Sequence, residues 1–262
     1  MGLATVFELV LHFLRRNRKY LSGRVEVLPL VVIKLDPIIS TQESDIMRFV
    51  RSKTRIPVPR ILLSTKDETR YYMLMTRAGG VSLECTWPTL TPSQRNNVIE
   101  QLRSYIAQLR SIPHSHPGTI CSIDFGPCRD GRVASAEAFG PFKDEAAFND
   151  YLIDVAEMWM DPSMLPEIRS RMKNDHSIVF THGDLAPRNI MVKGDRITGI
   201  IDWENAGWYP EHWEYVKALY HVGMNGEAKE SWMTALRRVF SKDYDYEWHL
   251  DRELSDHMVG GF

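Results

Sequence analysis

The chain has 262 residues, of which 44% are hydrophobic and 25% charged, and its formal net charge is -2. This composition is that of a globular protein, and it excludes a disordered tail, a collagen and a coiled coil. With 32 basic and 34 acidic residues, the chain has no broad cationic field for a phosphate backbone, so nucleic acid is not expected as a partner. Near this length a single hydrophobic core stops growing, which favours two lobes.

The cysteine pattern and the first residues bear on the compartment. Cys85, Cys121 and Cys128 are too few and odd in number for a disulfide framework, and none belongs to a CxxC pair of the kind found in zinc sites. In residues 1–19 the basic residues follow the apolar part, the reverse of a signal peptide, and no apolar run reaches the ~20 residues that span a bilayer. We expect a cytoplasmic protein without a membrane span, whose N-terminal helix packs on the fold or, alternatively, contacts a membrane or a partner.

The first predicted elements are strands followed by a helix. Residues 24–35 are rich in Val, Leu and Ile and are interrupted by Pro29, which predicts two short strands or one strand with a kink. Ser40 with Glu43 three residues later has the pattern of a capping box, and apolar residues at helical spacing follow. The predicted helix ends before residues 56–60, because Pro57 and Pro59 force extended backbone there.

Two further strands complete the predicted N-terminal lobe. They cover about residues 60–64 and 71–76, and the glycine pair at 79–80 ends the run. We therefore assign residues 1–78 to a small lobe with an N-terminal helix, an abbreviated sheet and one helix, and residues 79–262 to a second lobe.

The second lobe is predicted to be mostly helical. An amphipathic pattern predicts a long helix over residues 91–111, and shorter helices are predicted near 144–160 and 163–173. Helices dominate again to about residue 240, and the last ~20 residues are expected to be loosely held. The catalytic loop and the metal-binding hairpin described next belong to this lobe.

A β-hairpin is predicted between these helices. Residues 190–193 and 197–201 are strand-like, and the Gly-Asp pair at 194–195 is a favoured two-residue turn. Pairing outward from this turn places Asn189 opposite Ile200. Asn189 and the residue two positions after Ile200 then become diagonal neighbours, roughly 7 Å apart at the backbone.

That diagonal neighbour is Asp202, and Asp184 lies on the loop that enters the hairpin. An amide oxygen and a carboxylate at this separation can share a hard cation such as Mg²⁺. A loop carboxylate beside them suits the positioning or deprotonation of a hydroxyl group. The alternative is that Asp184, Asn189 and Asp202 are ordinary turn and cap residues. However, repelling carboxylates at the ends of buried strands would be costly without a cation or donors, which favours the functional interpretation.

Three short segments resemble a known family: residues 182–185 (HGDL), Asn189, and residues 201–204 (IDWE). They resemble the catalytic and metal-binding segments of the aminoglycoside phosphotransferase-like family, a relative of protein kinases. Further similarity to its fungal branch is carried by residues 54–60, 121–132 and 202–218, so the resemblance covers roughly residues 23–222.

The resemblance implies an α+β, bilobal, protein-kinase-like fold with a small β-rich N-lobe and a larger, mostly helical C-lobe. It also implies that Asp184 is the catalytic base and that Asn189 and Asp202 are the Mg²⁺ ligands. His182 is expected to brace the backbone of this loop rather than to act as a base.

The kinase-like fold further implies a lysine that binds nucleotide phosphates and a glutamate that pairs with it. Lys34 ends the apolar run VVIK, where such a lysine would lie. The alternative for Lys34 is a snorkelling side chain at a strand end. Glu43 falls on the apolar side of its helix and is the expected partner; alternatively it serves only the capping box, and Asp45 substitutes for it.

The adenine is expected at the strand that joins the lobes, YYMLMTRAGG, as in the family. This implies adenine contacts at the backbone of Thr76 and Ala78, with Met75 lining the pocket. The sequence departs from the family at the start, because no glycine-rich loop precedes Lys34 and only Gly23 lies nearby. Backbone amides for the phosphates are therefore absent or come from a shorter turn.

The sequence thus predicts an ATP- and Mg²⁺-dependent phosphotransferase that transfers the γ-phosphate to a hydroxyl of a small molecule. The alternative is a kinase-like nucleotide-binding or regulatory protein with little or no transfer. The acceptor, an antibiotic-resistance role and the oligomeric state do not follow from the sequence.

Overall fold

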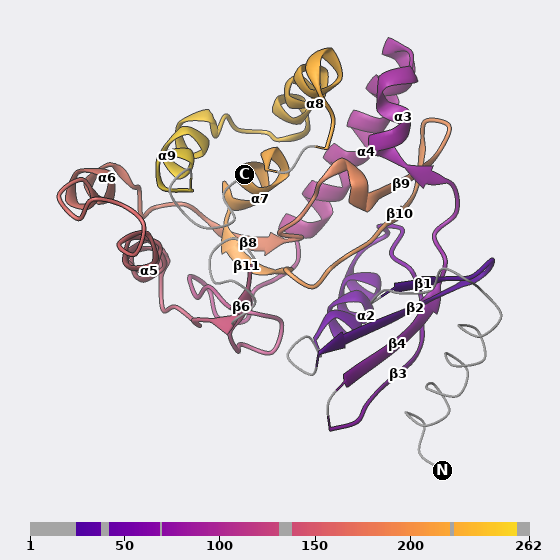
Figure 1. Cartoon of the computed structure of the whole chain (residues 1–262), viewed down its shortest axis with the longest axis horizontal. Helices are drawn as coiled ribbons and strands as arrows, with labels where there is room; N and C mark the ends of the chain where they lie inside the picture. The colour runs from indigo at the N-terminus through magenta and orange to yellow at the C-terminus, as the bar shows by residue number, and fades with distance from the viewer. Residues whose placement is uncertain (1–24, 38–41, 69, 131–137, 221–222, 256–262) are drawn as a thin grey trace.

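The computed structural model describes residues 25–37, 42–68, 70–130, 138–220 and 223–255 (Figure 1). The predicted N-terminal helix and Ser40 lie outside these residues. The described part of the chain forms a lobe built on a four-stranded sheet and a larger, mostly helical lobe, in agreement with the expected α+β class.

The first lobe is an antiparallel sheet with the strand order β1-β2-β4-β3. Its strands are β1 (Val25–Val27), β2 (Val31–Pro37), β3 (Ile61–Lys66) and β4 (Arg70–Thr76). The sequence predicts strands in these regions, and of its two alternatives for residues 24–35 the structure shows two separate strands. A tight turn joins β1 to β2, in which Leu28 N–H donates to the carbonyl of Val31 over 2.9 Å. The register places Lys34 opposite Met73 of β4.

Helix α2 (Glu43–Lys53) packs on this sheet. Its buried apolar residues recur at helical spacing: Ile46, Met47 and Val50. The helix begins at Glu43, and its N-cap Gln42 makes no side-chain capping bond. The predicted capping box, which makes Glu43 the third helical residue, is therefore wrong. Instead of closing a capping box, the buried Glu43 carboxylate contacts Lys34 and the backbone of Trp203.

A connector after β4 ties the sheet to the hairpin of the second lobe. Strands β5 (Val81–Ser82), β9 (Ile190–Lys193) and β10 (Arg196–Ile200) form a sheet in the order β10-β9-β5. Gly80 has a φ of +88°, and a Cβ there would lie 2.0 Å from the carbonyl oxygen of Val192. Only glycine allows this close approach, so Gly80 fixes the connector against the hairpin.

The predicted hairpin is present, with its two-residue turn, but its register differs from the prediction. A bulge at Thr198 interrupts the ladder, and Ile201 N–H donates to the Asn189 carbonyl over 3.0 Å. The predicted pairing of Asn189 with Ile200 is therefore wrong by one residue. The bulge is stabilised by the Thr198 hydroxyl, which donates to the Met191 carbonyl over 3.1 Å.

The second lobe consists mainly of helices. They are α3 (Leu83–Thr86), α4 (Pro92–Arg110), α5 (Glu145–Ala156), α6 (Leu165–Arg171), α7 (Trp213–Leu219), α8 (Gly226–Val239) and α9 (Asp245–Ser255). Short 3₁₀ helices are η2 (Trp87–Thr89) and η3 (Pro187–Asn189), and two-stranded ribbons pair β8 (Ile178–Thr181) with β11 (Gly207–Pro210) and β6 (Cys128–Arg129) with β7 (Ala138–Phe139). None of the helices within the described ranges combines the length and the apolar character needed to cross a bilayer.

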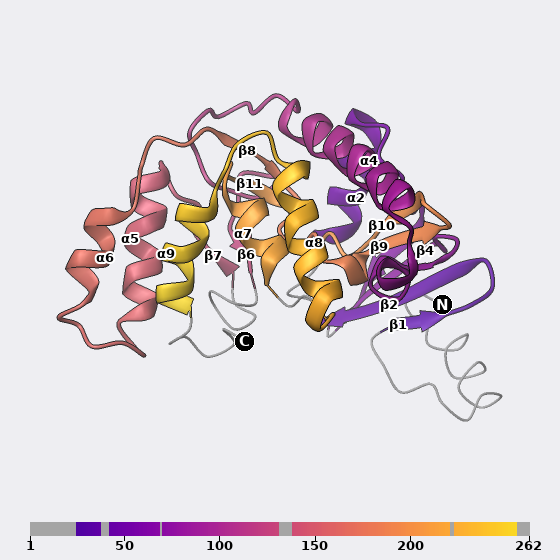
Figure 2. The ribbon, with the colours of Figure 1, turned by 90° about the horizontal axis from the view of Figure 1, so that it is seen from above.

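Helix α9 corrects the expectation of a loosely held C-terminal segment. Its residues Leu250 and Leu254 are 5% and 2% exposed and pack in a cluster with Leu165 and Ile168 of α6. Figure 2 shows α5, α6 and α9 side by side, at the end of the molecule away from the four-stranded sheet. The polar composition of α9 reflects one solvated face, while its other face is part of the core. The domain division after residue 78 stays a prediction.

Candidate functional site

A cleft of about 510 Å³ opens between the first sheet and the hairpin. This volume is in the range of pockets that bind small ligands. Val25 and Val27 of β1 line it on the sheet side, and Met191 and Ile201 of the hairpin line it on the other. The cleft brings together most of the site residues expected from the sequence: Lys34, Glu43, Met75, Thr76, Ala78, Asn189 and Asp202.

Lys34 lies at the centre of the charged part of this cleft. Its Nζ is 2.8 Å from Glu43 Oε2 and 2.9 Å from Asp202 Oδ1, and its side chain is only 10% exposed. The ion pair with Glu43 is thus present, and the alternative of a snorkelling lysine does not describe this geometry. Asp45 instead pairs with Arg48 on the helix surface, at 2.8 Å.

The Glu43 carboxylate is almost fully enclosed. Burial raises the pKa of Glu43 to about 7, against the opposing effect of the Lys34 ammonium, and the Asp202 carboxylate adds to the increase. Its other oxygen accepts a hydrogen bond from Trp203 N–H over 3.2 Å. Glu43 therefore links α2, β2 and the end of the hairpin, and it fixes the position of the lysine.

Asp202 has a backbone conformation that is uncommon for a residue other than glycine. Its φ is +66°, in the left-handed region. The segment after it is anchored, since the Trp203 indole is buried and donates to the Ile200 carbonyl over 2.9 Å. A residue held in such a conformation costs on the order of 1 kcal/mol and persists only where its surroundings determine it, which is typical of functional sites.

Asp184 lies on the loop between β8 and the hairpin and does not line the cleft itself. Its carboxylate accepts two hydrogen bonds from Arg188, at 2.7 and 2.8 Å, and one from Asn189 Nδ2 at 2.7 Å. Because the Asn189 amide nitrogen faces Asp184, its side-chain oxygen is the atom left for a cation. The structure thus connects Asp184 to the cleft through Asn189.

His182 holds the backbone of this loop in place through hydrogen bonds of its ring. It is fully buried; its Nε2 donates to the Ile201 carbonyl over 3.1 Å, and its Nδ1 accepts from Asp184 N–H over 3.1 Å. Burial lowers the pKa of His182, so the neutral ring suits this pair of bonds. Gly183 has a φ of +78°, and a Cβ there would lie 2.6 Å from the Asn205 carbonyl oxygen. The loop accordingly requires glycine at this position.

Two glutamates at the site were not among the predicted site residues. Glu204 Oε2 lies 3.2 Å from Lys34 Nζ and lines the cleft. Glu214 of α7 accepts hydrogen bonds from the backbone N–H groups of His182 and Gly183, at 2.5 and 3.2 Å. Glu204 could have been predicted as a site residue, because it follows Asp202 and Trp203 directly. Glu214 could not, because no sequence pattern distinguishes it from a solvated helical glutamate.

A pH-dependent contribution to stability is expected from Glu214. Burial raises its pKa to about 7, although the two backbone N–H donors oppose the shift. A folded-state pKa above the unfolded value of 4.5 means that this contribution is complete below pH 4.5 and is lost as the pH rises to about 7. Glu214→Gln should remove this loss.

The measurement is urea unfolding of the wild type and of Glu214→Gln, each near pH 4.5 and again at a pH above 7. Between these two pH values, the unfolding free energy of the wild type should fall by about 3 kcal/mol more than that of Glu214→Gln. Equal changes in the two proteins would show that Glu214 does not titrate in this way.

The chain is similar in sequence to known phosphotransferases. Residues 37–253 match the phosphotransferase enzyme family. The chain is 28% identical over 159 residues to an aminoglycoside 3'-phosphotransferase of Streptomyces fradiae, covering 60% of this chain and 55% of that protein. It is 27% identical over 179 residues to an aminoglycoside 3'-phosphotransferase of Enterococcus faecalis, covering 64% and 61%. The chain thus spans little more than half the length of the curated relatives it matches.

Solved structures with the same fold include two phosphotransferases. An aminoglycoside phosphotransferase of Streptomyces rimosus superposes with a TM-score of 0.58 at 16% identity, covering 96% of this chain and 98% of that one. A macrolide 2'-phosphotransferase of Brachybacterium faecium gives a TM-score of 0.53 at 15% identity, covering 87% and 80%. These structures confirm the bilobal, kinase-like fold, while the fungal branch stays a prediction. With most of its length matched by the family and its fold shared with these enzymes, the chain belongs to the phosphotransferase enzyme family.

Proposed function

We propose that the protein is an ATP- and Mg²⁺-dependent phosphotransferase that transfers the γ-phosphate of ATP to a hydroxyl group of a small molecule. The observation that carries the proposal is the position of Lys34 between Glu43 and Asp202 in one cleft, with Asn189 linking that cleft to Asp184. Family membership supports the same reaction class. Curated relatives named as aminoglycoside phosphotransferases support a small-molecule acceptor.

The donors at the hairpin fit a hard divalent cation. Asp202 provides a carboxylate and Asn189 an amide oxygen, and both line the cleft beside Lys34. Oxygen ligands of this kind suit Mg²⁺, which keeps several waters and bridges to phosphate oxygens. When bound, Mg²⁺ would neutralise charge on the phosphate oxygens. Lys34, fixed by Glu43, would bind the phosphates that are not transferred.

The proton of the acceptor hydroxyl would go to Asp184. The hydroxyl oxygen would form a bond to the γ-phosphorus while the bond to the bridging oxygen of ADP breaks. Arg188 contacts both oxygens of the Asp184 carboxylate and so sets its orientation before the acceptor binds. Most of the rate enhancement would come from positioning and charge neutralisation.

The connector offers one backbone donor for adenine. The N–H groups of Thr76 and Arg77 are bonded to the carbonyls of Arg60 and Leu30, each over 2.9 Å. Ala78 N–H has no hydrogen-bond partner among the residues that the structure describes, and Ala78 lines the cleft. We assign the adenine contact to Ala78 N–H and the Thr76 carbonyl, with Met75 as an apolar wall.

The turn between β1 and β2 takes the place of a glycine-rich loop. It has no glycine, and Leu30 in it is 82% exposed. Phosphate binding would therefore depend on Lys34 and on the metal ion rather than on a cradle of backbone amides.

The alternative, a nucleotide-binding or regulatory protein with little transfer, has the short β1–β2 turn in its favour. A thermal-shift titration with ATP, with and without Mg²⁺, tests for the site: stabilisation should grow with ligand concentration only when both are present. A screen of small-molecule extracts for transfer from γ-labelled ATP then tests for the enzyme. Mg²⁺-dependent ATP binding without any transfer would favour the alternative.

Glu204 should tune the metal requirement. With Asp202 and Glu43 it concentrates negative charge around Lys34, which attracts Mg²⁺ and repels metal-free nucleotide. Glu204→Gln removes one of these negative charges. The Mg²⁺ concentration for half-maximal stabilisation by ATP should therefore rise by roughly 10-fold, which corresponds to about 1.4 kcal/mol. The exposed Glu157→Gln is a matched control. An unchanged requirement in Glu204→Gln would show that this carboxylate does not act on the metal.

A further inference from the structure

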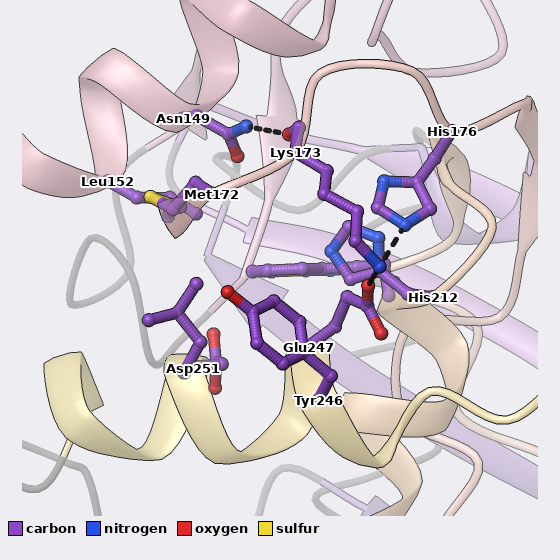
Figure 3. A pocket seen from close by; sticks show the side chains of 11 residues that line it. Asn149, Leu152, Met172, Lys173, His176, His212, Tyr246, Glu247 and Asp251 are labelled. Carbon is purple, nitrogen blue, oxygen red and sulfur yellow. Dashed lines mark hydrogen bonds and ion pairs between the residues drawn. The ribbon is translucent and has the colours of Figure 1, made fainter. Parts of the chain in front are cut away.

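A second group of metal-ligating side chains lies in the helical lobe, away from the cleft, and Figure 3 shows two of them, His176 and His212. Glu145 is the first residue of α5, His176 precedes β8, and His212 is the N-cap of α7. Glu247 of α9 lies beside the two histidines, and these three residues line a cavity of about 30 Å³, while Glu145 lies 2.7 Å from His176. Such a cavity has room for an ion or a water molecule. Four separate segments of the chain therefore bring polar side chains together beside this small cavity.

The three candidate ligands are close to one another. His176 Nδ1 lies 2.7 Å from Glu145 Oε1, and His212 Nδ1 lies 3.9 Å from the same oxygen. One ligand atom from each residue can be chosen so that all lie within 4.8 Å of one another. Glu145 is held in place because its Oε2 accepts from the backbone N–H of His176 over 2.9 Å. One oxygen of this carboxylate thus lies near a ring nitrogen of each histidine.

His212 supplies an independent observation that points to a ligand. Its Nδ1 is shielded from solvent and finds no hydrogen-bond partner within the part of the chain that the structure describes. An orphaned buried nitrogen costs roughly 1–3 kcal/mol unless something occupies it. Metal ions bind the neutral form of imidazole through a ring nitrogen of this kind.

We propose that Glu145, His176 and His212 form a binding site for a divalent transition-metal ion, of which Zn²⁺ fits best. Two imidazoles and one carboxylate suit zinc, with a water molecule as a fourth ligand. Ligand atoms about 2.0–2.2 Å from a tetrahedral ion lie roughly 3.3–3.5 Å apart. The 2.7 Å and 3.9 Å separations bracket this value, so binding requires only small side-chain movements.

The surroundings resemble the outer shell of a metal site. Glu247 Oε1 lies 3.4 Å from His176 Nε2, so it can accept the ring proton and orient the imidazole when Nδ1 binds the ion. Lys173 pairs with the same Glu247 oxygen at 2.5 Å, and about half of its side chain is exposed. Its ammonium group can therefore turn toward solvent when a cation enters. With both histidines neutral, the two glutamates and this lysine leave a net negative charge.

The competing occupant is a proton. Despite burial, the hydrogen bonds to Glu145 and Glu247 raise the pKa of His176 to about 9, so without metal an imidazolium lies between two carboxylates. That arrangement satisfies His176 but leaves the His212 nitrogen without a partner. A metal ion at the same place satisfies both rings.

The proposed metal site is adjacent to two segments that hold the proposed catalytic loop in place. His176 stands two residues before β8, which leads into His182 and Asp184. His212 stands two residues before Glu214, which holds the backbone of that loop. The ion would tie these two segments to α5, so its expected role is structural and its first readout is stability.

The test uses tag-free, full-length protein stripped of metal, titrated with Co²⁺ and then Zn²⁺ in excess Mg²⁺ to occupy the acidic cleft. We expect one equivalent of Co²⁺ with the visible bands of a four-coordinate site, displaced by Zn²⁺, and a thermal midpoint that rises by several degrees with Zn²⁺. If the wild type takes up no ion at micromolar concentration, the cluster holds only the proton and the proposal is wrong.

Variants locate the ion. His212→Gln and Glu145→Gln should each lower Zn²⁺ affinity at least 100-fold, and Glu247→Gln should lower it roughly 10- to 100-fold as an outer-shell change. The exposed His249→Gln of α9 should bind like the wild type. If His212→Gln does not fold, His176→Asn serves in its place. Full affinity in these ligand variants would place the ion elsewhere and overturn the assignment.

Discussion

In Asp184→Asn, turnover with a hydroxyl acceptor is expected to fall by roughly 10²- to 10⁴-fold, the usual contribution of a positioned acid or base. The substitution keeps the size of the side chain but removes its charge and its basicity. Asp184 does not line the cleft, so the affinity for Mg²⁺-ATP should change little. The measurement is the initial rate of transfer, together with the ATP concentration that gives half-maximal thermal stabilisation.

The contacts of Asp184 make this variant informative. An asparagine oxygen can still accept from Asn189 Nδ2, so the link to the metal ligand persists, while the charge-assisted pair with Arg188 is weakened. Hydrolysis of ATP by water serves as a proxy before the acceptor is found. The exposed Asp154→Asn of α5 controls for the loss of one negative charge. If Asp184→Asn keeps the wild-type turnover, Asp184 takes no part in the reaction. Only the nucleotide-binding role of Lys34 and Asp202 would then stand.

The fold was predictable where the local pattern and the tertiary environment agree. Strands β2 and β4 and helix α4 have strong apolar periodicity, and each of them contributes to the core. The bulge at Thr198 was not predictable, because it depends on hydroxyl contacts that only the folded hairpin makes. The start of α2 was misplaced since a capping pattern is short and occurs by chance.

The candidate site was predictable in part for a similar reason. A hairpin turn brings Asn189 and Asp202 together by local pairing, and Asp184 is close in sequence. Glu214 reaches the loop from a helix more than twenty residues away, and only the packing of α7 directs it there. The cluster of Glu145, His176 and His212 likewise comes from three separate segments without a spacing motif. Contacts made by tertiary packing leave little trace in a single sequence.

In Asp202→Asn, Mg²⁺-dependent binding of ATP is expected to weaken by at least 100-fold. The substitution removes the carboxylate proposed to ligate the ion, while asparagine tolerates the left-handed backbone at this position better than most residues. Removing the charge also takes repulsion away from buried Glu43, so the unfolding free energy should be unchanged or slightly higher.

This prediction is tested by measuring the ATP concentration required for thermal stabilisation at saturating Mg²⁺, in the wild type and in Asp202→Asn. Asp195→Asn, in the turn of the same hairpin, is the matched control, because its side-chain oxygen accepts from Asn97 and an asparagine oxygen can do the same. In Asp202→Asn, Lys34 keeps Glu43 as a partner, so the lysine stays in place and the loss of binding reports on the metal ion. If Asp202→Asn binds Mg²⁺-ATP as tightly as Asp195→Asn does, the metal ion is held by other residues and the assignment of Asp202 and Asn189 as its ligands is wrong.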